Sequence, residues 1–348
     1  VRVAVHEIPC SGKIDAQYLL HAFEGGGQGL CVVTCPAGQC QLGQGNYRAG
    51  QLALDGGYAA EGITLHFQWF HAGGFTSRGN YHADRNSLTV PNFSASALGG
   101  TVNGQVQLAF KDLVFRTQTR THGVSLAAAI AAVDNPSLPI IPLHWSAVVD
   151  VDSLTTGTAD FKNVDSRGVA LWAPRAELQP GQIPATAHLD YHYSMAANTL
   201  TLAPSEISTP SSRIRMSGTL GRTDSAIDAL FETEDLVPWD DFINRIRGEH
   251  AEPKFIAGRS TWQGRMTGPL NGPTFAGHVK ATGARYDAIL WDSIEGDIIY
   301  EPNGFRFLRG AAIRDRSSAQ FEVSIDLDEW HFDPDRLKYS RKRFHCEF

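Results

Sequence analysis

Four of the five cysteines lie near the start of the chain, at Cys10, Cys31, Cys35 and Cys40. Cysteines in such a group can bind a metal, pair as disulfides, or serve as small apolar residues. The spacings C-x3-C and C-x4-C match neither the C-x2-C pairs of a zinc site nor a redox C-x-x-C motif. All three interpretations stay open, and we predict neither a metal site nor a cofactor.

Two groups of polar residues also have spacings that could support chemistry. His188 and His192 flank Asp190 on one face of a predicted strand, as metal ligands can. Asp326 and Asp328 form a carboxylate pair of the kind found in glycosidases and calcium sites. A solvent-facing strand surface explains both groups more simply, because alternate residues of a strand share a face.

No motif for nucleophilic, phosphate-binding or metalloprotease chemistry is present. The sequence contains no G-x-S-x-G, no G-x4-G-K-[ST] and no H-E-x-x-H. The glycine clusters at residues 25–29 and 43–45 lack the strand-to-helix setting of a phosphate-binding loop. We therefore predict no catalytic residues and a protein that is not an enzyme.

The charge balance argues against nucleic acid as a partner. The formal net charge is −7, whereas a nucleic-acid-binding protein needs a basic face. The basic cluster at residues 338–343 lies at the end of the chain, where a solvated tail is the simpler interpretation.

Strict alternation of apolar and polar residues recurs along the chain and predicts strands with one solvent-exposed face and one apolar face. It occurs at residues 63–69, 105–110, 189–193, 214–220, 294–300 and 321–328. Buried parallel strands would instead be continuously apolar. The 34 glycines and 17 prolines suit many short strands joined by turns. The predicted fold is all-β: an elongated, curved, mainly antiparallel repeat sheet with a few short capping helices.

Two short helices are predicted, near residues 125–133 and 239–247. Ser125 is placed to cap the first, and Pro238 lies in the first turn of the second. The predicted divisions are a Cys/Gly-rich segment (1–50), two β-repeat regions (51–222 and 223–335) and a basic tail (336–348). The start at Val1 rather than Met, with no leader and no apolar run of about 18 residues, predicts a segment of a longer protein.

Helices this short cannot cover the apolar face of so large a sheet, so that face must close on itself, pack on another sheet, or stay open as a groove for an apolar ligand. We favour the groove, because an uncovered apolar patch marks a binding surface. The residues expected to line the groove are Leu65, Phe67, Val106, Leu108, Phe110, Ile214, Met216, Ile294, Ile298, Tyr300, Phe321, Val323, Ile325 and Leu327.

Several glycine-rich motifs resemble the repeats of the TamB family of AsmA-like proteins. Residues 94–106 resemble the family's Gly-Gly hairpin, and residues 213–236 resemble a repeat unit. The G-P-L-x-x-P-x-x-x-G element at residues 268–277 and the strand pair at 286–300 resemble the unit that follows. The resemblance covers about residues 50–335 and leaves out both ends of the chain.

The resemblance implies a non-enzymatic role in outer-membrane biogenesis. The groove would carry phospholipid across the periplasm, or would assist translocation and assembly of outer-membrane or autotransporter proteins. The implied partners are phospholipid or unfolded outer-membrane protein strands, and a TamA-like protein that binds outside this segment. The implied location is the periplasm, with a tether to the inner membrane that this segment lacks.

Two other functions stay open from the sequence alone. Open sheet edges could bind unfolded strands by β-augmentation. Aromatic-rich strands could instead belong to a secreted carbohydrate-binding or adhesin-like module; the tryptophans that permit this are Trp69, Trp145, Trp172, Trp262 and Trp291.

Overall fold

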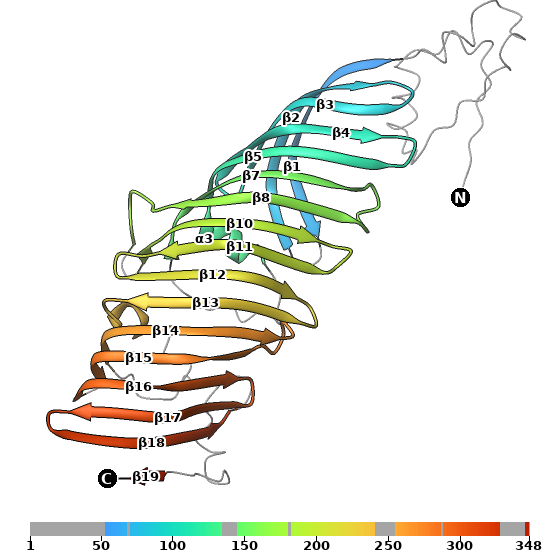
Figure 1. The fold of residues 1–348 in the computed structure, drawn as a ribbon. Helices are drawn as coiled ribbons and strands as arrows, with labels where there is room; N and C mark the ends of the chain where they lie inside the picture. The colour runs from blue at the N-terminus through green and yellow to red at the C-terminus, as the bar shows by residue number, and fades with distance from the viewer. Residues whose placement is uncertain are drawn as a thin grey trace, which may run out of the picture.

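The computed structural model describes residues 53–67, 70–133, 145–179, 182–240, 255–286, 288–327 and 345–347. These residues form one long antiparallel sheet with very little helix, so the all-β prediction is confirmed (Figure 1). Figure 1 shows the strands lying side by side in one long, twisted sheet, with the first strands at one end and the last at the other.

The sheet has 17 strands. They are β1 (Leu54–Phe67), β2 (Phe70–Ala83), β3 (Ser87–Ala97), β4 (Gly100–Ala109), β5 (Val114–Ser125), β7 (Val148–Thr158), β8 (Val164–Ala173), β10 (Thr186–Ser194), β11 (Thr199–Ser208), β12 (Ser212–Gly221), β13 (Ser225–Thr233), β14 (Ile256–Gly268), β15 (Thr274–Tyr286), β16 (Ile289–Glu301), β17 (Gly304–Arg314), β18 (Ser317–Asp326) and β19 (His345–Glu347). The remaining elements are β6 (Trp145–Ser146) and β9 (Ile183–Pro184), which form a short parallel pair, the helix α3 (Leu126–Ala131) and the 3-10 helix η2 (Val237–Trp239).

Each strand of the large sheet pairs with the next one along the chain, so the topology is a simple meander. Tight turns make this possible. The β3–β4 turn has Leu98 at φ 50° and Gly99 at φ 85°, the two positive values that suit a two-residue hairpin. Hydrogen bonding is continuous through β12 and β13, on either side of the division predicted near residue 222.

The pairing register aligns one residue of each strand from β1 to β18 into a single row that crosses the sheet. Because directly paired residues share a face, this central row lies on one face throughout. It consists of Tyr58, Gly79, Phe93, Gly104, Thr119, Ser153, Gly168, Tyr191, Leu202, Gly218, Ile227, Met266, Phe275, Tyr300, Phe305 and Ile325. We call the face on which these side chains lie the apolar face, and the opposite one the charged face.

The first predicted helix is present but shorter than expected. Ser125 caps α3, accepting a hydrogen bond from the backbone N–H of Ala128 (3.4 Å), and the helix ends at Ala131. It lies against a small core of Val124, Leu126, Ala147 and Val149 on the apolar face. Among the described residues, no helix is long and apolar enough to cross a membrane.

Most of the second predicted helix lies outside the described residues. Its beginning is the 3-10 helix η2, with Pro238 in the first turn. Trp239 is 8% exposed and packs edge-on against Phe231, with ring centroids 4.9 Å apart. The Trp239 indole N–H donates to the Ser212 hydroxyl (2.8 Å), which in turn donates to Thr233 (2.8 Å). This chain of hydrogen bonds fastens η2 to β12 and β13.

Candidate functional site

The register brings most of the predicted groove residues onto the apolar face. They lie on the central row, or an even number of residues away from it along the same strand: Val106, Leu108, Ile214, Met216, Ile294, Ile298, Tyr300, Phe321, Val323 and Ile325. Strands β4 and β18 show the expected alternation, with half-buried positions on this face and exposed positions on the other, whereas in β16 the residues of both faces are half-buried. Alternation therefore grouped these residues on one face, and their role in lining a ligand groove stays a prediction.

Four predicted groove residues do not join this set. Leu65 is 48% exposed beside two register shifts in the β1–β2 pairing. Phe110 follows the end of β4 and is 40% exposed. Leu327 follows β18, is 8% exposed, and donates its N–H to the Asn303 carbonyl (3.0 Å). The side chain of Phe67 lies outside the described residues.

Aromatic rings pack against one another on the apolar face of the C-terminal strands. The Tyr300 ring lies between Phe275 and Phe305, with centroids 6.3 and 6.4 Å away, and Phe307 stacks on Phe321 at 5.3 Å. Burial raises the pKa of the Tyr300 hydroxyl to about 12. In this half of the sheet, the apolar side chains therefore cover one another.

We expect the raised pKa of Tyr300 to destabilise the fold at high pH. An unfolded tyrosine loses its proton near pH 10, so between pH 10 and about 12 the unfolded state binds fewer protons than the folded state. The stability contributed by Tyr300 is complete below pH ~10 and is lost as pH rises toward about 12. Denaturant midpoints at pH ~9 and ~12 should fall less in Tyr300→Phe than in the unaltered protein, because phenylalanine cannot ionise. An equal fall in both would contradict this assignment.

The charged face carries cross-strand pairs of polar and charged side chains. Histidine–aspartate pairs join neighbouring strands at His82–Asp55 (2.7 Å), His122–Asp150 (2.8 Å), His192–Asp165 (2.7 Å) and His278–Asp297 (3.0 Å). A hydrogen bond from the Gly123 N–H (2.8 Å), aided by His122, holds the pKa of Asp150 below its usual range. His278 and Arg309 do the same for the pKa of Asp297.

The polar groups predicted from spacing lie on this charged face. His188, Asp190 and His192 are exposed on β10, and His192 pairs with Asp165 rather than with its neighbours. Asp326 is exposed at the end of β18, whereas Asp328 lies outside the described residues. Within the part of the chain that the structure describes, no three His, Cys, Asp or Glu side chains gather to hold a metal.

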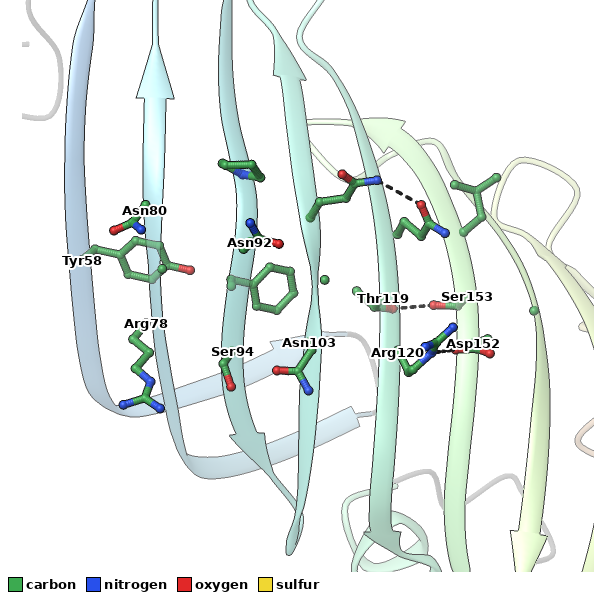
Figure 2. A pocket seen from close by; sticks show the side chains of 18 of the residues that line it. Tyr58, Arg78, Asn80, Asn92, Ser94, Asn103, Thr119, Arg120, Asp152 and Ser153 are labelled. Atoms are coloured by element: carbon green, nitrogen blue, oxygen red, sulfur yellow. Dashed lines mark hydrogen bonds and ion pairs between the residues drawn. The ribbon is translucent and has the colours of Figure 1, made fainter.

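A polar groove of about 1380 Å³ crosses strands β1 to β8 on the charged face (Figure 2). Its floor is the backbone of the central row, where Gly79, Gly104 and Gly168 alternate with larger residues. One wall contains Arg78, Ser94, Asn103, Arg120 and Asp152. The other contains Asn80, Asn92, Gln105, Gln118, Leu154 and Arg167. Figure 2 shows the bond between Arg120 and Asp152 (2.9 Å). The Gln105 side-chain amide donates to the Gln118 side-chain oxygen (3.0 Å).

Comparison with known proteins finds a similarity at the N-terminal end of the chain. The model of the family "methyl-viologen-reducing hydrogenase, delta subunit" matches residues 1–54. An iron-sulfur subunit of the F420-non-reducing hydrogenase of Archaeoglobus profundus is 36% identical over 47 residues, which are 14% of this chain and 34% of that protein. The chain thus spans about a third of the length of this curated relative. No solved structure matches the chain.

These matches overturn the assignment to the TamB family, and with it the outer-membrane role. The proteins that they name are hydrogenase subunits, and neither match supports phospholipid transport, assembly of outer-membrane proteins, a TamA-like partner or an adhesin. The resemblance to TamB repeats rested on turn glycines, prolines and alternation, which any antiparallel meander requires. Such features indicate a fold and do not identify a family. The periplasmic location stays a prediction, although the TamB resemblance from which it followed no longer supports it.

Sequence reasoning missed two features that bear on function. It left metal binding, disulfide pairing and a purely apolar role open for the four N-terminal cysteines, which crowd into residues 10–40. It also missed the polar groove, because each wall is assembled from single residues of successive strands, and only the pairing register aligns them. The amide-rich composition of these strands was visible, but their register was not.

Proposed function

We propose that this chain is an iron–sulfur electron-transfer subunit of a hydrogenase-type complex, with the cluster in its N-terminal segment. The observation that carries the proposal is the coincidence of two features. All four N-terminal cysteines fall within the 54 residues that match the hydrogenase delta-subunit family. The name of the curated relative, which is similar over 47 residues, also describes an iron–sulfur subunit.

The donor set fits such a cluster. Both [2Fe–2S] and [4Fe–4S] clusters are commonly held by four cysteine thiolates, and Cys10, Cys31, Cys35 and Cys40 supply that number. When bound, the cluster would supply one-electron transfer. These cysteines lie outside the described residues, so the assignment rests on the chemistry of the donors.

The long sheet would then serve as a scaffold that binds partner subunits. Its charged face is open to solvent and carries ion pairs and a polar groove, which suit contact with another protein. The chain would carry electrons between partners and would form or break no substrate bond itself.

Metal analysis of the anaerobically purified chain tests this proposal. We expect about two or about four iron atoms per chain, with an equal amount of acid-labile sulfide. The double variant Cys31→Ser/Cys35→Ser should lose most of both. Cys346→Ser, which changes a cysteine of the short strand β19, is the matched control and should keep them.

Two results would contradict the proposal. One is a folded, anaerobically prepared chain without sulfide. The other is a Cys31→Ser/Cys35→Ser variant that keeps the full iron content.

A further inference from the structure

We propose that the polar groove binds an extended acidic polypeptide segment of a partner protein. The residues that line the groove belong to strands β1 to β8, so this inference goes beyond the electron-transfer role and does not depend on it.

The shape of the groove fits an extended chain. It crosses seven strands, and six interstrand spacings give a length of about 29 Å. Its walls are two residues apart along each strand, or about 7 Å. A polypeptide in extended conformation would fill this length with about nine residues.

The amides of the walls can recognise a peptide backbone. Asn80, Asn92, Gln105 and Gln118 lie on successive strands of one wall, and Asn103 lies on the other. Each amide has both donor and acceptor atoms, as a peptide bond does. The Gln105–Gln118 hydrogen bond (3.0 Å) shows that neighbouring amides come within bonding reach of each other.

The charges of the groove favour an acidic peptide. Its lining contains three arginines, Arg78, Arg120 and Arg167, but one carboxylate, Asp152, in a chain whose net charge is −7. Arg120 is paired with Asp152 (2.9 Å). Neither Arg78 nor Arg167 forms an ion pair with any carboxylate of the described residues. A guanidinium binds a carboxylate through two parallel hydrogen bonds, so these two arginines suit acidic side chains.

The C-terminal half of the charged face differs in this respect. There Arg215 pairs with Glu232 (2.6 Å) and Arg265 with Asp228 (3.0 Å). Arg309 pairs with Asp297 (2.6 Å). The excess of positive charge is therefore a property of the groove and not of the whole face.

Peptide fits the groove better than a nucleic acid strand does. Single-stranded nucleic acids bind through aromatic rings on which the bases stack. Tyr58 and Phe93 belong to the central row, so their rings lie on the apolar face. The walls of the groove contain no aromatic side chain.

Fluorescence anisotropy with labelled probes tests the proposal on the full chain. The probes are a Glu/Ser peptide and a Lys/Ser peptide, each of about ten residues, and an oligothymidylate of similar length. We expect the Glu/Ser peptide to bind and the other two to bind at least about tenfold more weakly. Stronger binding of the Lys/Ser peptide or of the oligothymidylate than of the Glu/Ser peptide would overturn the proposal.

A pair of double variants locates the binding. Arg78→Gln/Arg167→Gln removes two exposed charges and should weaken binding of the Glu/Ser peptide about tenfold or more. Arg222→Gln/Arg314→Gln removes two exposed charges outside the groove and should leave binding unchanged. An equal effect of the two double variants, or no effect of the first, would show that the groove is not the site. Iron content should be the same in both, which separates failure here from failure of the electron-transfer proposal.

Discussion

Replacing Gly218 with alanine should destabilise the sheet by at least about 3 kcal/mol. Gly218 has φ 135°, a conformation that residues with a Cβ rarely adopt. It also lies at the middle of the sheet, paired with Ile227, and an added Cβ would collide with the carbonyl oxygen of Ala226. Because that oxygen belongs to the backbone of β13, relief requires the two strands to separate locally.

Gly62→Ala separates the two causes of this loss. Gly62 also has a positive φ, 67°, but an added Cβ there would meet no atom within 4 Å. We expect Gly62→Ala to lower the free energy of unfolding by about 1 kcal/mol, from backbone strain alone. Urea unfolding followed by circular dichroism measures both variants. Equal losses would show that the close approach between β12 and β13 has no energetic weight.

Replacing Trp239 with alanine should lower the free energy of unfolding by about 3–5 kcal/mol. The indole is 8% exposed, packs edge-on against Phe231, and donates to the Ser212 hydroxyl (2.8 Å). Its removal leaves a cavity over β12 and β13, and takes away a hydrogen bond to a buried hydroxyl.

Trp239→Phe keeps an aromatic ring at this site and loses the N–H donor. Its expected cost is about 1–2 kcal/mol, because Ser212 retains its bond to Thr233 (2.8 Å). Urea midpoints of the two variants should therefore differ clearly. Similar values would mean that η2 is held by the hydrogen bond and not by ring packing.

The strands and the fold class could be predicted from the sequence because the patterns that specify them lie within short segments of the chain. Alternation in residues 321–328 specified both a strand and its buried side, and Ser125 marked the start of α3. The length of α3 could not be predicted, because the chain after it contacts β2: the Ala132 carbonyl accepts from the His71 N–H (2.7 Å), and Val133 forms a bridge with Phe70. Alternation also fails where a strand is irregular, as it did at Leu65, beside the register shifts of β1.

The candidate sites could not be predicted in the same way. The polar groove exists only because the pairing register of seven strands aligns Arg78, Asn103 and Arg167 along it. Alternation does not specify that register. The cysteines posed a different difficulty. Their spacing matches no motif considered for zinc or redox chemistry, so the role that we propose for them rests on the similarity to hydrogenase subunits.

Electron paramagnetic resonance of the full chain, purified anaerobically and reduced with dithionite, tests the electron-transfer role most directly. Our account predicts a low-temperature signal from a reduced iron–sulfur cluster, present in Cys346→Ser and absent in Cys31→Ser/Cys35→Ser. A folded, iron-supplemented chain that gives no cluster signal in either redox state would contradict it, as would a signal that survives loss of Cys31 and Cys35.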